Sequence, residues 1–426
     1  MFKQWPFQLQ KITHRLSVRA GLFALLAVVS SLAAVLLDGY VPDGFVELAG
    51  GNAVDNILNV MASSMLIVTT FALSTMMAAY TAATQHTTPR ATNLIINDSK
   101  SHSAISIFLG AFIYSVVSLI ALSTKYYGPR GRVILLLMTV IVLIAVVWVI
   151  IRWVEELKNM GSVHETIRRV ECATAKALAY RAERPTFGCM SMDQIPSNAK
   201  PVRCHDVGYI QNIDVDSLGK LADKEYIEMY IEKDVGGYVH LQSNLVFIIS
   251  ENGVSPELEE KIREAFAIGD QRTFLNDPRF GLSVLSGIGI KALSPSLNDP
   301  GTAIDVVGSL VRVLINWENQ RVTCKIPDTE YRRLFFPEME LNDLYNDAFY
   351  GLIKESAKHL EVVKAMQSGL EILAKSTSVQ SKEIALKQLE TLNQRSREEL
   401  TSGVDASLIQ AASMIGENQR KAVDKH

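Results

Sequence analysis

The sequence predicts a membrane α-helical fold, in which four transmembrane helices precede a cytoplasmic α+β region with a small β-rich module and a mostly helical domain. Two observations predict this fold class. Residues 20–151 are overwhelmingly apolar, whereas residues 152–426 have the mixed charged composition of a soluble protein. The apolar part contains four stretches of roughly 20 residues, the length that a helix needs to cross a bilayer.

The membrane domain is expected to cover residues 1–151, with spans at about 20–37, 57–83, 104–122 and 133–151. The first stretch is too long for a signal-peptide core and has no cleavage site after it. No Asp, Glu, Lys or Arg lies well inside any span. Proton-coupled carriers usually place ionisable groups there, so this class is disfavoured.

The basic residues that flank the spans predict the orientation. Lys3, Lys11, Arg15 and Arg19 precede the first span, whereas the first loop, Asp38–Asn56, has acidic residues and no basic one. Basic residues also follow the second and fourth spans. The third loop opposes this bias, but the majority places both termini in the cytoplasm.

The second span is long and has a polar stripe. At about 1.5 Å per residue its 27 residues reach about 40 Å, which exceeds the hydrocarbon core. Its polar residues recur at helical spacing, and Arg90 follows them at the cytoplasmic end; the stripe consists of Asn59, Ser63, Thr70, Ser74, Thr81, Thr84, Gln85 and Thr88. Such a stripe either packs against neighbouring helices or lines a water-filled path. The helix should end at Thr88-Pro89.

The cytoplasmic region is expected to contain four parts. They are a connector helix and loop at 152–207, a small β-rich module at 208–250, a helical region at 251–325 and a C-terminal helical domain at 326–426. From Ser255 to the end the pattern predicts helices only. The last three are expected at Glu338–Ala374, Ser378–Thr401 and Asp405–Glu417.

Composition and motifs exclude several function classes. The net charge of −3 gives no electrostatic basis for nucleic-acid binding. Cys189, Cys204 and His205 resemble half of a zinc site, but a second close ligand pair is missing, so no metal is expected. The sequence contains no GxSxG, P-loop, HExxH or DxDxDG motif, so we expect neither an enzyme nor a cofactor.

The stretch KALSPSLNDPGTA, residues 291–303, is the most distinctive local pattern. Proline should end one helix at Pro295, and Asp299 should cap the next helix with Pro300 in its first turn. Capping does not account for all of the polar residues. They could instead form a ligand site, whose candidate residues, with the charged run upstream, are Arg272, Asp277, Ser294, Pro295, Asn298, Asp299, Pro300 and Thr302.

Two segments carry a family resemblance. Residues 269–281 with residues 292–303, and Ser74–Arg90 at the end of the second span, are similar to bacterial predicted integral membrane proteins that form a domain family of unknown function. His86 stands where an aromatic residue is common in that family, and Thr87-Thr88 stand where Phe-Ser is common. Residues 208–250 are similar too. The resemblance implies a multi-pass protein of the bacterial inner membrane, and it implies no activity.

Two functions are compatible with these features. The first is an oligomeric channel for small ions, in which the polar stripe lines the path and the cytoplasmic domain gates it. The second is a membrane-anchored sensor or scaffold that binds a ligand or protein partner. The long amphipathic helices after Pro327 have more apolar positions than one chain can bury, which favours a homo-oligomer in the lipid bilayer.

Overall fold

A computed structural model describes residues 16–36, 53–96, 99–124, 129–157, 161–251, 253–324, 329–375 and 378–400. The chain forms two compact units. The first, here called the helical unit, comprises Met1–Gln85 and Thr92–Glu165. The second, the mixed unit, comprises His86–Ala91 and Thr166–His426.

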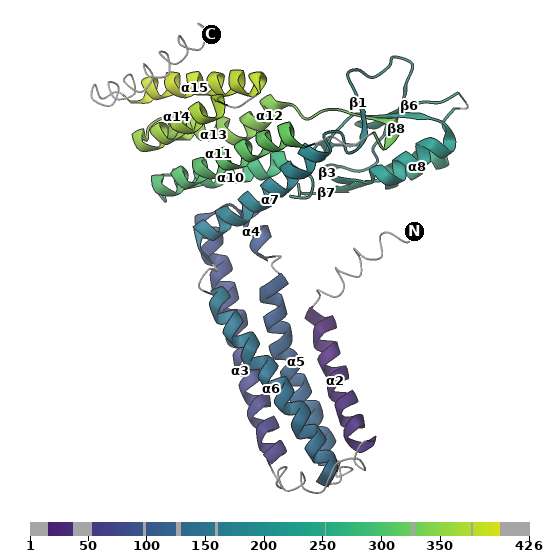
Figure 1. Cartoon of the computed structure of the whole chain (residues 1–426), viewed down its shortest axis with the longest axis vertical. Helices are drawn as coiled ribbons and strands as arrows, with labels where there is room; N and C mark the ends of the chain where they lie inside the picture. Colours follow the sequence, from purple (N-terminus) through teal and green to yellow (C-terminus); the bar gives the residue numbers. More distant parts are fainter. Residues whose placement is uncertain are drawn as a thin grey trace. The chain divides into compact units, whose positions relative to one another are not determined.

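The helical unit contains four long helices (Figure 1), which are α2 (Leu16–Leu36), α3 (Ala53–His86), α5 (Ser99–Ser123) and α6 (Pro129–Leu157). α5 contacts both α2 and α6. Gly110 permits the close approach of α2 and α5, because a Cβ there would overlap the Phe23 ring. Tyr114 and Phe108 of α5 are fully buried in the core of this unit.

Three helices are long and apolar enough to cross a membrane, namely α3, α5 and α6. α2 covers the first predicted span, but its described apolar part is the shorter segment Gly21–Ser30. The architecture is therefore three long candidate spans with a short apolar one near the N-terminus. Residues 38–52 of the first loop, on which the predicted orientation depends, lie outside the described residues, and its last four residues belong to the first turn of α3.

The second span ends as predicted. α3 stops at His86, and α4 (Pro89–Ile96) begins with the proline. The connector also breaks near Gly161, which has a φ of +80°. Helix α7 (Val163–Glu183) follows this break.

The mixed unit contains two sheets. The larger has the order β1-β8-β4-β6-β2, and the smaller has the order β5-β3-β7. Helix α8 (Val215–Glu225) packs with the core of these sheets, and Asp214 is its N-cap. The strands are β1 (Cys189–Ser191), β2 (Lys200–Arg203), β3 (Gly208–Ile213), β4 (Glu228–Ile231), β5 (Tyr238–Val239), β6 (Asn244–Ile249), β7 (Phe266–Gly269) and β8 (Tyr331–Phe336).

The prediction of helices only after Ser255 is wrong, because β7 and β8 both lie beyond it. β7 pairs with β3, and β8 inserts between β1 and β4 in parallel to both. β1 and β2 likewise lie in a segment expected to be a loop. The sheets thus recruit strands from well outside residues 208–250, since strand pairing depends on partners far apart in the sequence.

The remaining helices form a stacked bundle (Figure 1), in which α10 packs on α11, α11 on α14 and α14 on α15. The expected helix Glu338–Ala374 is interrupted by the π-helix η3 (Asn346–Tyr350) and by a turn before α14. The expected helix Asp405–Glu417 lies outside the described residues. The bundle elements are α10 (Pro278–Ala292), α11 (Pro300–Thr323), α12 (Leu341–Tyr345), α13 (Gly351–Ser356), α14 (Leu360–Ala374) and α15 (Val379–Glu399). Helix α9 (Pro256–Glu264) contacts β2 and β7 of the sheets instead.

Candidate functional site

The polar stripe of α3 lies on the side of the helix opposite its buried side. The buried positions are Val54, Leu58, Met61, Met65, Ala72, Met76 and Ala83. At about 100° per residue, Asn59, Ser63, Thr70, Ser74 and Thr81 lie on the far side. All five are exposed in the single chain, as are Thr84 and Gln85. We call these seven residues the α3 stripe.

The stripe hydroxyls are tied to their own helix. Ser63 Oγ, Ser74 Oγ and Thr81 Oγ1 each donate a hydrogen bond of 2.9 Å to the carbonyl four residues earlier. Thr70 and Thr84 donate to α3 carbonyls in the same way. Each hydroxyl oxygen keeps lone pairs that point away from this bond and can accept hydrogen bonds or contact a cation. The stripe therefore presents acceptors outward.

The residues predicted at the end of the stripe differ in their surroundings. Gln85 and Arg90 are exposed. Thr88 is half-buried in the mixed unit, where its carbonyl accepts a hydrogen bond of 3.0 Å from the Ala91 amide at the start of α4. Thr88 thus leaves the α3 stripe and serves the turn between two helices.

Two turns of the same shape begin α10 and α11. The tetrapeptide Leu-Asn-Asp-Pro occurs at residues 275–278 and again at 297–300. Asn276 and Asn298 have positive φ angles of 58° and 46°. The aspartate that follows is the N-cap in each turn, with φ and ψ near −117° and 80° in one and −115° and 82° in the other. This repetition was a visible signal that the sequence analysis missed.

Asp277 is the buried aspartate of the pair. Arg272 donates two hydrogen bonds of 2.8 Å to its carboxylate, and the Phe280 amide donates a third. Burial raises the pKa of the Asp277 carboxyl, while the hydrogen bonds and charge of Arg272 act in the opposite direction. Gly236 lies directly against this pair, because a Cβ there would overlap the carboxylate. Arg272 and Asp277 therefore connect a turn of the β region to the start of α10.

Asp299 is the exposed aspartate of the pair. Its carboxylate accepts a hydrogen bond of 3.0 Å from the Thr302 amide and one of 2.6 Å from the Thr302 hydroxyl. These two bonds lower the pKa of Asp299, and the positive charge of His86 contributes to the same shift. Ser294 Oγ donates to the Lys291 carbonyl at 2.6 Å. The turn between Leu293 and Pro300, here called the signature turn, is closed by its own polar groups.

The candidate residues do not gather at one place. Arg272 and Asp277 lie at the start of α10, whereas Ser294, Asn298, Asp299 and Thr302 lie beyond its end. A helix of 15 residues such as α10 is about 22 Å long. Arg279, at the start of α10, pairs instead with Asp343 and Asp347. The two turns are separate features.

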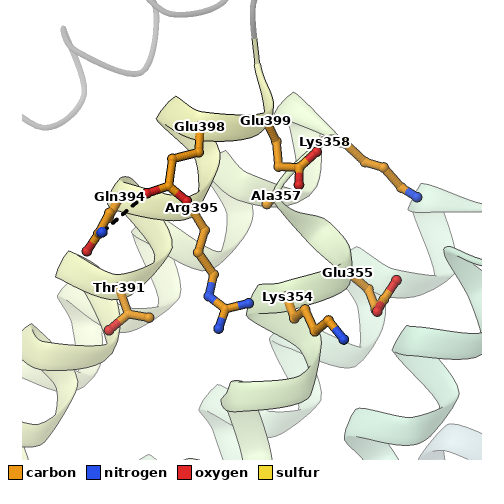
Figure 2. Close-up of a pocket in the computed structure, with 9 residues that line it drawn as sticks. All are labelled: Lys354, Glu355, Ala357, Lys358, Thr391, Gln394, Arg395, Glu398 and Glu399. Atoms are coloured by element: carbon orange, nitrogen blue, oxygen red, sulfur yellow. Dashed lines mark hydrogen bonds between the residues drawn. The ribbon is translucent and has the colours of Figure 1, made fainter.

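A charged cavity of about 520 Å³ lies between α13 and α15 (Figure 2). Within the described residues, Lys354, Lys358 and Arg395 line it without an ion pair to the three glutamates of the same cavity. Arg395 lies 5.6 Å from the centre of the Tyr350 ring. Figure 2 shows Glu398 turned toward Gln394, from which it accepts a hydrogen bond of 3.2 Å. The remaining lining residues are Glu355, Ala357, Thr391 and Glu399.

Neither metal nor thiol chemistry is apparent in the described part of the chain. It contains no group of three or more His, Cys, Asp or Glu side chains that could hold a metal ion. Burial raises the pKa of the Cys189 thiol to about 12, which keeps this group protonated and unreactive. Cys204 is also buried, and Cys172 is exposed without a second cysteine beside it.

The comparison with known proteins supplies the family. The profile of the family described as "Predicted membrane protein (DUF2254)" matches residues 13–371 of this sequence. The chain belongs to this family. The membership confirms the resemblance seen in Ser74–Arg90 and in residues 269–303, and it makes the chain a membrane protein.

A part of the chain is also similar to two uncharacterized mycobacterial proteins. An uncharacterized protein of Mycobacterium tuberculosis (strain ATCC 25618 / H37Rv) and one of Mycobacterium bovis (strain ATCC BAA-935 / AF2122/97) are each 35% identical over 123 residues. The match covers 28% of this chain and 23% of each relative. No solved structure matches the chain.

Proposed function

We propose that the protein is an oligomeric channel or pore-like protein for small ions. The α3 stripe lines the path, and the mixed unit is a cytoplasmic regulatory region. The proposed setting is the bacterial inner membrane with both termini in the cytoplasm, as the flanking basic residues favour. No catalytic step is part of this proposal.

The observation that carries the proposal is the position of the α3 stripe. Its hydroxyl and amide groups lie opposite the side of α3 that packs within the unit, so a single chain leaves them uncovered. The hydroxyl hydrogens are satisfied by carbonyls of α3, but the outward lone pairs and the Asn59 and Gln85 amides are better solvated by water or polar neighbours than by lipid tails. Several copies that turn their stripes toward a common axis would place these groups in water.

The stripe also has the chemistry of a weakly selective path. Ser and Thr oxygens and the Asn59 and Gln85 amides can replace part of the hydration shell of an ion without fixed charge. Charged residues occur only near the ends of α3. Asp55 forms an ion pair of 3.7 Å with Arg132, and Arg90 lies beyond the other end.

Current across a planar bilayer that contains the purified protein tests the proposal. The double variant Thr70→Leu/Ser74→Leu should abolish or reshape discrete openings, because it replaces two stripe oxygens with apolar groups. Thr69→Leu/Thr75→Leu is the matched control. These threonines are half-buried beside the packed side of α3, and their hydroxyls also bond to helix carbonyls.

Equal effects of the two double variants would contradict the proposed lining. So would wild-type openings that neither variant changes, because the path would then lie elsewhere. If the wild-type protein carries no current under varied voltage, tension and salt, a membrane-anchored sensor or scaffold is favoured over a channel.

The alternative is a membrane-anchored sensor or scaffold that binds a ligand or protein partner through the mixed unit. The cavity between α13 and α15 favours it, because Lys354, Lys358 and Arg395, which form no ion pair among the described residues, offer donors to a bound molecule. Both walls are firmly anchored, since Ile353 of α13 and Leu392 of α15 are fully buried. This alternative needs no assembly around the α3 stripe.

A further inference from the structure

The segment that follows α3 is buried at once in the mixed unit. Thr87 and Ala91 are both 0% exposed, although His86 and Pro89 beside them lie at the surface. The segment is only six residues long, His86 to Ala91, and it belongs to the mixed unit while the rest of α3 belongs to the helical unit. It is therefore the point at which the stripe helix enters the other unit.

Lys291, in the last turn of α10, holds this segment. Its Nζ donates a hydrogen bond of 2.7 Å to the Thr87 carbonyl. In an unbroken helix that carbonyl would accept from the Ala91 amide, but the Ala91 amide bonds to Thr88 instead. Carbonyls at a helix C-terminus carry partial negative charge, and a lysine ammonium satisfies them well.

Gly287 lies one turn before Lys291 on the same side of α10 and contacts the same segment. A Cβ built on Gly287 would lie 3.5 Å from Thr88 Cγ2. Positions four residues apart on a helix lie one above the other, so Gly287 and Lys291 form one contact face. We call this face, with Thr87 and Thr88, the α10 clamp.

The signature turn fixes the end of α10 that carries Lys291. The Asp299 amide donates to the Ala292 carbonyl at 2.8 Å, and the Asn298 amide donates to the Ser294 carbonyl at 2.9 Å. The signature turn thus holds the end of α10 that carries Lys291, and Lys291 bonds to the segment that follows α3.

We propose that the α10 clamp couples the mixed unit to the path, so that a displacement of α10 or of the signature turn shifts α3 and opens or closes the stripe. The proposal rests on the proposed channel function. Its physical basis is that the stripe lies on one helix, Ala53–His86, and that the segment held by Lys291 follows this helix directly in the chain. An interaction made in only one of two states shifts their ratio by its own free energy.

A disulfide across the clamp tests the contact without any current. In the full-length protein, Thr88→Cys/Gly287→Cys should close an intramolecular disulfide under mild oxidation, because a Cβ at position 287 would lie 3.5 Å from Thr88 Cγ2, a position that a cysteine sulfur can take. A gel mobility shift that reductant reverses reports the bond. Thr88→Cys alone and Gly287→Cys alone are the controls, and they account for the four native cysteines.

The same double variant tests the coupling in the bilayer. Oxidation should hold the open probability at one extreme, and reductant should restore its wild-type range. Lys291→Met should raise the rate of amide hydrogen exchange at Thr87–Ala91. It should also shift the ratio of open to closed times by about tenfold, which corresponds to the loss of one charge-assisted hydrogen bond. Lys291→Arg should restore most of both effects, and the exposed Lys364→Met should change neither.

The outcomes separate the clamp from the channel. A folded double-cysteine protein that forms no disulfide overturns the clamp. A disulfide that forms while the open probability stays unchanged overturns the coupling. A disulfide and faster exchange in Lys291→Met, with no current from any variant, support the contact and count against the proposed function alone.

Discussion

Asp277 and Asp299 show how one local motif serves two purposes. Both follow an asparagine with positive φ, both cap a helix, and both precede a proline. Asp277 is buried beside the Arg272 guanidinium, whereas Asp299 is exposed and its carboxylate bonds to the amide and hydroxyl of Thr302. The difference in surroundings, and not the motif, sets the free energy that each contributes.

We expect Asp277→Ala to destabilise the mixed unit far more than Asp299→Ala. Loss of Asp277 removes both the α10 cap and the buried partner of Arg272, whose own side chain is 22% exposed, so we expect a cost of about 3 kcal/mol. Loss of the Asp299 cap costs about 0.5–2 kcal/mol. Thermal unfolding of the two purified variants measures the difference. Equal shifts in Tm would mean that the Arg272–Asp277 pair adds nothing beyond capping.

At the scale of elements, sequence reasoning succeeded where the cause is local. Ser255, Asp299 and Ser378 cap helices as their residue types predict, and Pro89 ends α3 where expected. It failed where the partner is distant. β8 has no local signal to set its place between β1 and β4.

The candidate site shows the same limit. The pairing of Arg272 with Asp277 was one of several that the charged run allowed, and five residues separate the partners. The bond from Lys291 to Thr87 joins residues 204 positions apart. Nothing in either neighbourhood indicates that contact. The stripe of α3 was predictable because helical periodicity alone places its residues on one side.

β8 should be essential to the larger sheet although it comes late in the chain. Leu334 is fully buried in the core of the sheet region, and it pairs with Met229 of β4. Leu334→Ala should therefore cost about 2–5 kcal/mol through lost burial and a cavity. Arg332→Ala, at an exposed position of the same strand, should stay within about 0.5 kcal/mol. Denaturant titration measures the free energy of unfolding of both variants. A loss as small for Leu334→Ala as for Arg332→Ala would show that β8 is not part of the core.

At the scale of the whole molecule, the helical unit exposes both apolar side chains and the polar α3 stripe, and these two surfaces need different surroundings. Val60, Ile67 and Phe71 of α3 are exposed in the single chain, as are Leu137 and Ile144 of α6. Lipid can cover these apolar side chains. Lipid solvates the outward oxygens and amides of the stripe less well, so we expect water or a second copy of the chain to lie against this side of α3.

We therefore expect the protein to be a defined homo-oligomer in nanodiscs, which mass measurement of the intact particle can establish. The variant Thr70→Leu/Ser74→Leu distinguishes a stripe that lines a path from a stripe that forms the contact between subunits. If the stripe lines a path, the variant should keep the wild-type mass and lose its current, because leucine removes oxygens from the lumen without touching the subunit contacts.

If the stripe is the contact itself, leucine should force the copies apart, and the particle mass should fall, because small residues are what allow membrane helices to approach closely. Thr69→Leu/Thr75→Leu should keep the wild-type mass in either case. A wild type that is a monomer at every concentration would exclude a path built from one helix per chain. The charged cavity between α13 and α15 would then become the feature to pursue, with the protein acting as a membrane-anchored sensor.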